Sequence, residues 1–475
     1  MSRPAVAAVA KEPRIEILGS FESVYQPAHD IDNIESTGHE QRWREDLSLL
    51  LSCGVTTLRY PVRWHRVEEE AGRYDWARTD EVLGWMRDHD MRPIVDLVHH
   101  MSVPRWLDGG FADRRYHQAV LRYYQAFARR YPWVPGYTLF NEPFTTLFLA
   151  GSEAVFPPYL EGTRGFIELV RNVMPSIAEG SRMFRHLLPQ ARHLNVDSCE
   201  RHTAAQPEAQ EYAEYANDRR FALTDLLLGR HLDPHRPFIA DLVANGGEDL
   251  LDLPAGHIDV LGLDYYAHSQ WQFTSPGCGA GTSPQPGRLD DLIVEYWDRY
   301  RLPVLLGETN IRGHSSDRST WLKYTLEHCQ SACRRGVPVE GYCWFPFVDS
   351  CDWASLLRRA DGAIDPVGVF WLDGDRNRRE SSMSATFRMA AAGVPASGLP
   401  AYRLRRPVAD WLQGYLPQMA HWEWLEAPDE PVCTNAPELG DIMEFGEREL
   451  FAEPLPGAAY EELRDAGGRQ VERGG

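Results

Sequence analysis

The feature that most constrains the fold is a regular alternation of short apolar runs with longer amphipathic segments between about residues 14 and 390. Short apolar runs bounded by turn residues are typical of buried strands, and longer segments with apolar residues three or four apart are typical of surface helices. Strands that alternate with helices build parallel sheets. The eight expected strands are residues 15–19, 55–60, 93–98, 136–140, 193–196, 258–263, 304–307 and 339–344.

Eight strands are the number in a closed parallel barrel, so the pattern predicts an α/β protein with a (β/α)8 TIM barrel over residues 1–395. An open, doubly wound sheet has the same local pattern, but no glycine-rich phosphate loop follows the first expected strand. A loop rich in Gly, Pro and Ser at residues 274–287 is expected on the surface, over the mouth of the barrel. The expected helices are residues 40–52, 79–90, 115–130, 165–188, 209–228 and 319–335.

The alternation ends near residue 395, and residues 396–475 are predicted to form a C-terminal extension, partly irregular or disordered. Too few apolar residues follow Leu425 for an independent core. We expect Trp411, Trp422 and Trp424 to pack on the barrel, ahead of a loosely held end. Docking of a protein partner through this extension is the alternative.

Charge and composition exclude several classes of partner. A formal net charge of −20 argues against nucleic acid and favours a neutral substrate, with a local cationic pocket for a phosphorylated sugar as the open alternative. No stretch has the roughly 18 apolar residues that span a bilayer, and the N-terminal segment lacks the apolar core of a signal peptide. The eight cysteines form no CxxC pair, which predicts reduced thiols in a cytoplasmic protein.

Two glutamates stand directly after expected strands. Glu142 follows the fourth strand and Glu308 follows the seventh. The carboxyl ends of barrel strands face the active site, and these two strands lie across the barrel from each other. A lone Glu at such a place is usually half of an ion pair, because a buried carboxylate needs a partner. Two carboxylates over one pocket are instead the machinery of glycoside hydrolysis, in which one is protonated and the other ionised.

The residues around both glutamates resemble those of the family 1 glycoside hydrolases. TLFNEP at residues 138–143 is similar to the family's acid/base motif TFNEP, and LGETN at 306–310 is similar to its nucleophile motif I/V-T-E-N-G, with Gly307 where Thr is usual. DYY at 264–266 stands in for N-Y-Y. Further similar segments, in the family's order, are RYPVRW at 59–64, GRYDW at 72–76, HHMSVPRWL at 99–107, DSCDW at 349–353 and VFWLD at 369–373.

This resemblance covers roughly residues 14–390 and implies a retaining β-glycosidase that needs no metal and no cofactor. Glu142 would be the acid/base and Glu308 the nucleophile, with their carboxyl oxygens about 5–5.5 Å apart. Arg59 and Tyr266 would hold Glu308, although Tyr265 is the alternative, since neighbouring strand residues alternate faces. Asn141 would bind the sugar 2-hydroxyl.

The resemblance also implies a binding site for the glycone, the sugar that is transferred. Its expected residues are Gln26, His100, Trp344, Asp352 and Trp353, with Trp344 as the stacking floor. Glu22 is the alternative to Gln26, because it is closer to the end of the first strand. Metal binding by His99 and His100 is disfavoured, since adjacent strand residues point in opposite directions.

The chain also departs from the usual family pattern at the glycone site. Met101 and Ser102 replace an aromatic–Asp pair, and Asp352 replaces the Glu that reads two sugar hydroxyls. We therefore expect a small-molecule or oligosaccharide β-glycoside substrate whose glycone is not fixed by the resemblance. A transglycosidase that uses an alcohol acceptor is the first alternative, and a non-catalytic sugar-binding barrel is the second.

Overall fold

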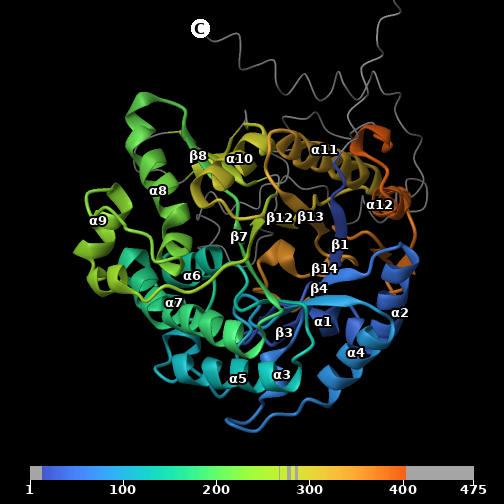
Figure 1. The fold of residues 1–475 in the computed structure, drawn as a ribbon, viewed down its shortest axis with the longest axis horizontal. Coiled ribbons are helices and arrows are strands. Elements are labelled where there is room, and N and C mark those ends of the chain that lie inside the picture. Colours follow the sequence, from blue (N-terminus) through green and yellow to red (C-terminus); the bar gives the residue numbers. More distant parts are fainter. Residues whose placement is uncertain (1–12, 267, 275–279, 284–286, 403–475) are drawn as a thin grey trace, which may run out of the picture.

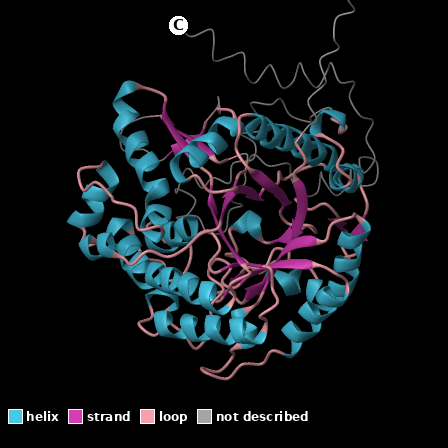
Figure 2. Ribbon diagram, viewed as in Figure 1, coloured by secondary structure: helices cyan, strands magenta, loops and turns pink. Residues whose placement is uncertain are grey.

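The computed structural model describes residues 13–266, 268–274, 280–283 and 287–402, and its centre is a closed barrel of eight parallel strands (Figures 1 and 2). The strands are β1 (Glu16–Ser20), β4 (Thr57–Pro61), β5 (Arg92–Asp96), β6 (Gly136–Thr138), β7 (Arg192–Ser198), β9 (Val260–Asp264), β12 (Val304–Glu308) and β13 (Val339–Trp344). Their order around the barrel is β1-β13-β12-β9-β7-β6-β5-β4. All eight expected strands are present, so the predicted TIM barrel is confirmed.

Helices form a ring around the barrel (Figure 2). In α5 (Tyr116–Arg130) the buried residues include Val120, Tyr123, Tyr124 and Phe127, which are three or four positions apart and form one apolar face. The other expected helices are α2 (His39–Ser52), α4 (Ala77–Asp88), α7 (Gly162–Leu187), α8 (Gln210–Leu227) and α11 (Ser315–Arg334). Further helices are α1 (Asn33–Ser36), α3 (Trp64–Val67), α6 (Pro143–Gly151), α9 (Pro237–Ala244), α10 (Leu289–Tyr300) and α12 (Ser382–Ala391).

A second, three-stranded sheet lies outside the barrel, with the order β11-β10-β8. Its strands are β8 (Arg201–Ala204), β10 (Gln270–Phe273) and β11 (Ala280–Thr282). The prediction of a loop over 274–287 is therefore wrong at Ala280–Thr282, which pairs antiparallel with β10. Small residues give no strand periodicity, but the edge of β10 offers backbone partners to them. Residues 275–279 and 284–286 lie outside the described part.

Short strand pairs complete the loops at the carboxyl ends of the barrel. They are β2 (Tyr25–Gln26) with β3 (Ile31–Asp32), β14 (Ser350–Cys351) with β15 (Ile364–Asp365), and β16 (Trp371–Leu372) with β17 (Arg378–Arg379). A small apolar cluster that includes Leu18, Val196 and Leu305 is separate from the main core and comes from the barrel strands. This cluster fills the barrel interior, so polar side chains gather at the strand ends.

The chain beyond residue 395 continues onto the barrel as far as residue 402. Lys323 of α11 donates to the carbonyls of Ala396, Ser397 and Leu399 at 2.9, 3.2 and 2.8 Å. The expected packing of Trp411, Trp422 and Trp424 lies outside the described residues. The six cysteines of the described part are free thiols. In that part, no helix combines the length and the apolar character needed to cross a bilayer.

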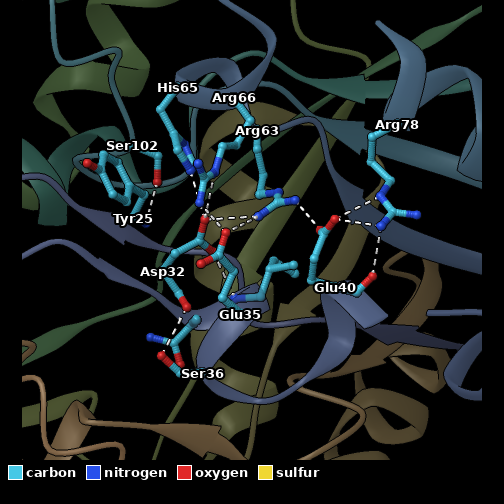
Figure 3. A network of polar contacts seen from close by, with 12 residues as sticks. Tyr25, Asp32, Glu35, Ser36, Glu40, Arg63, His65, Arg66, Arg78 and Ser102 are labelled. Atoms are coloured by element: carbon cyan, nitrogen blue, oxygen red, sulfur yellow. Dashed lines mark hydrogen bonds and ion pairs between the residues drawn. The ribbon is translucent and has the colours of Figure 1, made fainter. Parts of the chain in front are cut away.

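A charged network fixes the segment that follows β1 (Figure 3). Asp32 accepts from the Ile34 N–H at the start of α1, and its other oxygen accepts from Arg63 and His65, both at 2.9 Å. Arg63 also contacts Glu40, which in turn binds Arg78. Burial alone would raise the pKa of Asp32, but its bonds to His65 and Arg63 outweigh burial and lower the pKa to about 2.

We expect Asp32→Ala to lower the free energy of unfolding by about 3 kcal/mol at neutral pH, because Arg63 and His65 would lose their buried partner. The lowered pKa means that this contribution is present above the ordinary value of 3.8 and is lost as the pH falls toward about 2. Urea unfolding of both proteins measures the difference, which should shrink over that window. Glu35→Gln removes the charge of an exposed carboxylate and is the control, with an expected loss of about 0–1 kcal/mol. A difference that does not change with pH would contradict this account.

Candidate active site

The two glutamates reach the same pocket from different backbone settings. Glu308 is the last residue of β12, whereas Glu142 lies between β6 and α6, and its N–H donates to the Val196 carbonyl at 3.0 Å. Glu142 adopts a left-handed backbone with φ of 46°. This conformation is unfavourable for a residue with a side chain and persists only where the surroundings hold it. The anchored backbone directs the Glu142 carboxyl into the pocket.

A third carboxyl joins the pair. At least one oxygen each from Glu142, Asp264 and Glu308 lies within 4.8 Å of the others, and all three side chains are buried. In the described part of the chain, this is the group of side chains that is close enough to share a metal ion, and its oxygen atoms suit a hard cation. Without a cation, three buried carboxylates this close require protons or positive neighbours.

Arg59 and Tyr266 supply two donors to Glu308. Arg59 Nη1 lies 2.6 Å from Glu308 Oε1, and the Tyr266 hydroxyl donates to Oε2 at 2.7 Å. Arg59 also donates to Asn141 Oδ1 at 2.5 Å. These contacts favour a carboxylate anion at Glu308. Tyr265 points elsewhere, since its hydroxyl accepts from Gln270 at 2.9 Å.

Glu142 has the opposite environment. Burial raises its pKa well above the ordinary range, and the charges of Glu308 and Asp197 add to the effect. His100 Nε2 lies 3.8 Å from Glu142, but burial, with His99 and Arg59, lowers the pKa of His100 well below its usual value. His100 is therefore neutral and does not draw the proton from Glu142. One carboxyl is set up to carry a proton and the other to carry a charge.

Glu22 and Trp353 line one side of the pocket. The Trp353 indole N–H donates to Glu22 Oε2 at 2.8 Å, while Oε1 accepts from the backbone of Ser23 at 2.9 Å. His99 lies between two carboxylates: its Nδ1 is 2.8 Å from Asp96 Oδ2, and its Nε2 is 3.5 Å from Glu22 Oε1. Burial opposes a charge on His99, but the two carboxylates outweigh it and raise the pKa of His99 to about 10. A protonated His99 therefore anchors Glu22.

The structure does not bring Gln26 to the pocket. Gln26 is fully buried in β2, and its Oε1 accepts from the Ala28 N–H at 3.0 Å. Glu22, the alternative, lies two residues after the end of β1 and does line the pocket. The family spacing favours Gln26, whereas distance from the strand end favours Glu22, and of these two residues Glu22 lines the pocket.

Trp344 and Asp352 also lie outside the pocket lining. Trp344 is fully buried, and its indole N–H donates to the Val367 carbonyl at 3.0 Å. The next residue, Phe345, lines the pocket instead. Asp352 has a left-handed backbone with φ of 64°, and its carboxylate accepts from the Ala363 N–H at 2.9 Å, so it closes a turn. Its neighbour Trp353 reaches the pocket.

The cavity has a volume of about 370 Å³ and extends well beyond the carboxylates. Its far side is lined by Phe144, Phe148, Arg219, His268, Trp271 and Phe273. The Arg219 guanidinium lies 4.1 Å from the Phe148 ring centre, a cation–π arrangement. These residues come from α6, α8, β10 and the loop between β9 and β10, and they were not predicted because none of them belongs to a motif of the resemblance.

A closed parallel barrel with a buried carboxylate cluster at its strand ends is an architecture of the glycoside hydrolases. A family model described as glycosyl hydrolase family 1 matches residues 25–283, more than half of the chain, so the chain belongs to this family. It is accordingly a glycoside hydrolase that acts on O-glycosyl bonds.

Curated relatives are distant in sequence. Beta-glucosidase A of Thermotoga maritima is 21% identical over 381 residues, which cover 72% of this chain and 83% of the relative. Aryl-phospho-beta-D-glucosidase BglC of Bacillus subtilis is 22% identical over 395 residues, which cover 69% and 80%. Among solved structures, a beta-glucosidase from Thermotoga maritima in complex with castanospermine matches with a TM-score of 0.68 at 16% identity, over 80% of this chain and 98% of that one. The structural likeness confirms the fold.

Proposed function

We propose that the protein is a retaining β-glycosidase in which Glu142 is the acid/base and Glu308 the nucleophile. The observation that carries the proposal is the approach of their carboxyl oxygens to within 4.8 Å. Retaining enzymes place the two carboxyls about 5–5.5 Å apart, whereas inverting enzymes leave about 6.5–9.5 Å for a water molecule. The short separation supports direct attack by Glu308 on the sugar.

The reaction would proceed in two displacements. Glu142 gives its proton to the leaving oxygen while Glu308 attacks the anomeric carbon and forms a glycosyl ester. Glu142, now a carboxylate, takes a proton from water, which attacks the same carbon and releases Glu308. The buried Asn141 amide nitrogen has no hydrogen-bond partner among the described residues, so it is available to the sugar 2-hydroxyl.

The glycone side of the pocket supports a neutral sugar. Glu22 and Asp365 both line it, and carboxylates accept hydrogen bonds from hydroxyls but repel a phosphate. Arg312, which also lines the pocket, forms an ion pair with Asp365. Relatives include both beta-glucosidases and an aryl-phospho-beta-D-glucosidase. We propose that this protein takes an uncharged glycone, as opposed to a phosphorylated one.

The test is release of nitrophenol from aryl β-glycosides of glucose, galactose, mannose, fucose and xylose, with a 6-phosphoglucoside beside them and Glu308→Gln in parallel. We expect turnover of a neutral member and none in the variant. Proton NMR of the first anomer formed should give the β product. An α product would exclude retention, and transfer to added alcohol as the main reaction would favour the transglycosidase. A silent panel with folded wild-type protein would contradict the proposal.

We expect Glu22→Gln to lower kcat/KM for the best glycoside by roughly 10- to 100-fold, because a charged hydrogen-bond partner of the sugar and of Trp353 is lost. Steady-state kinetics measure the change. Asp352→Asn is the matched control, since its amide oxygen still accepts from Ala363 and the residue lies outside the pocket. Equal losses in the two variants would contradict the assignment of Glu22 to the glycone.

A further inference from the structure

Asp264 is a buried carboxyl that the proposed reaction does not use. It is the last residue of β9 and is fully buried, next to Glu142 and Glu308. Its carboxyl faces the Glu142 carboxyl as a side-chain hydrogen-bond partner, and neither oxygen accepts from any other group of the described residues. A buried carboxylate without a donor is costly, so the group must be balanced in another way.

Gly307 makes room for this carboxyl. A β-carbon at Gly307 would lie 2.6 Å from Asp264 Oδ1 and 3.2 Å from Val196 Cγ1, which is closer than real β-carbons approach the first of these atoms. Positions 264 and 307 are both places where the chain departs from the usual family motifs, with Asp for Asn and Gly for Thr. The two departures meet in one place, because the missing side chain leaves the hollow that the Asp264 carboxyl fills.

We propose that Asp264 is a positioning residue that acts through Glu142, so that the two carboxyls titrate as a pair and retain one proton to higher pH than Glu142 would alone. The inference rests on the proposed function, because it concerns the acid/base group. It assigns a role to a carboxyl for which the two-displacement reaction has no other use.

The charges around Asp264 support a retained proton. The titratable groups that face it are Arg59, Glu142, Asp197, Cys199, Tyr266, Glu308 and Cys343. Two cations face the pair: Arg59 already faces Glu308 and Asp96, and the protonated His99, which faces Glu142, already faces Asp96 and Glu22. Loss of the last proton would therefore add a second negative charge to the pair without a new positive neighbour. Burial, followed by the charge of Glu308, raises the pKa of both Asp264 and Glu142 well above the ordinary range.

The retained proton has a place in both displacements. It leaves Glu142 for the glycosidic oxygen in the first step, and the pair is then left with two negative charges. Such a pair is a stronger base than an isolated carboxylate, so it takes the proton of the attacking water more readily in the second step. The proton count is restored after each turnover.

The decisive experiment is the pH profile of kcat/KM for Asp264→Asn. We expect the basic limb to move down by about one pH unit, and kcat/KM to fall about ten-fold at pH values above both limbs, because an amide at position 264 cannot share the retained proton with Glu142. Gly307→Ala should move the limb in the wild-type background, since its methyl group displaces the Asp264 carboxyl. It should not move the limb further in Asp264→Asn. A uniform loss of activity with an unmoved basic limb would mean a merely structural role and overturn the proposal.

Infrared titration of the unliganded protein measures the protonation of the carboxyl pair directly and does not depend on turnover. The carbonyl band of a protonated carboxyl should be present at neutral pH and weaken in Asp264→Asn and in Glu142→Gln. If no glycoside is turned over, the proposed function fails and this band alone decides whether the pair holds a proton. Absence of the band, or inhibition of the wild type by added Mn²⁺ that Asp264→Asn relieves, would overturn the proposal, since the second result assigns the carboxyls to a cation.

Discussion

Glu308→Gln should lower kcat by on the order of 10⁴-fold or more on every aryl glycoside, because an amide cannot attack the anomeric carbon. The fold should survive, since the amide oxygen still accepts from Arg59 or Tyr266 and Arg59 keeps Asp96 as an acidic partner. Stopped assays with a dinitrophenyl glycoside measure the loss, and thermal unfolding controls for folding.

Azide tests the role of Glu308 by stereochemistry. In Glu308→Gly, azide can enter the space that the carboxylate leaves and attack the sugar from that side, which gives an α-glycosyl azide from a β-glycoside. In Glu142→Gly, azide would instead attack the glycosyl ester from the other side and give the β product. If rescue of Glu308→Gly gave the β azide, Glu308 would not be the nucleophile.

Glu142→Gln should have a large effect that depends on the leaving group. For alkyl glycosides and disaccharides, whose leaving oxygen needs a proton, we expect a loss of roughly 10²–10⁴-fold in kcat/KM. A dinitrophenyl glycoside should lose much less in kcat/KM, because its leaving group departs as an anion. Its glycosyl ester should then accumulate, since no base activates water, and a burst of dinitrophenol would report it.

The pH dependence of the same variant gives a second readout. Burial and then the charge of Glu308 raise the pKa of Glu142, so the protonated acid persists toward neutral pH and is lost as the pH rises through that pKa. The wild-type basic limb should therefore be absent in Glu142→Gln. An equal fractional loss for all leaving groups, with the limb retained, would assign the acid to another residue.

The barrel could be predicted from sequence because its strands are covered by helices on one side and fill the interior on the other. Such strands are largely apolar: β12 (Val304–Glu308) is apolar up to Gly307, and in β13 (Val339–Trp344) Glu340 is the exposed exception. β11 was not predictable in this way, since Ala280–Thr282 has no apolar pattern and depends on the edge of β10. Partner strands, rather than local sequence, decide such short elements.

The approach of Glu142 and Glu308, the proposed catalytic pair, was predictable for a related reason: both lie within a few residues of strand ends, where the barrel dictates their direction. Family spacing was the basis for expecting Gln26, Trp344 and Asp352 at the glycone site. The backbone turns that follow the strand ends direct neighbouring residues into the pocket instead. Glu22, Phe345 and Trp353 line the pocket in this region. Arg219, on the far side of the pocket, comes from helix α8 of the outer layer, and no sequence motif marks it as a pocket residue.

The close approach at Gly307 couples positions 264 and 307 in any series of single substitutions. A chain with a side chain at position 307 has no space for the present Asp264 carboxyl, whose oxygen would lie 2.6 Å from the new β-carbon. Gain of a side chain at 307 while Asp264 is present therefore moves that carboxyl, as expected for Gly307→Ala, whereas loss of the side chain at 307 leaves a small hollow beside Glu308. A laboratory lineage selected back toward the usual family motif should therefore disturb the site less at each step when it changes position 264 before it refills position 307.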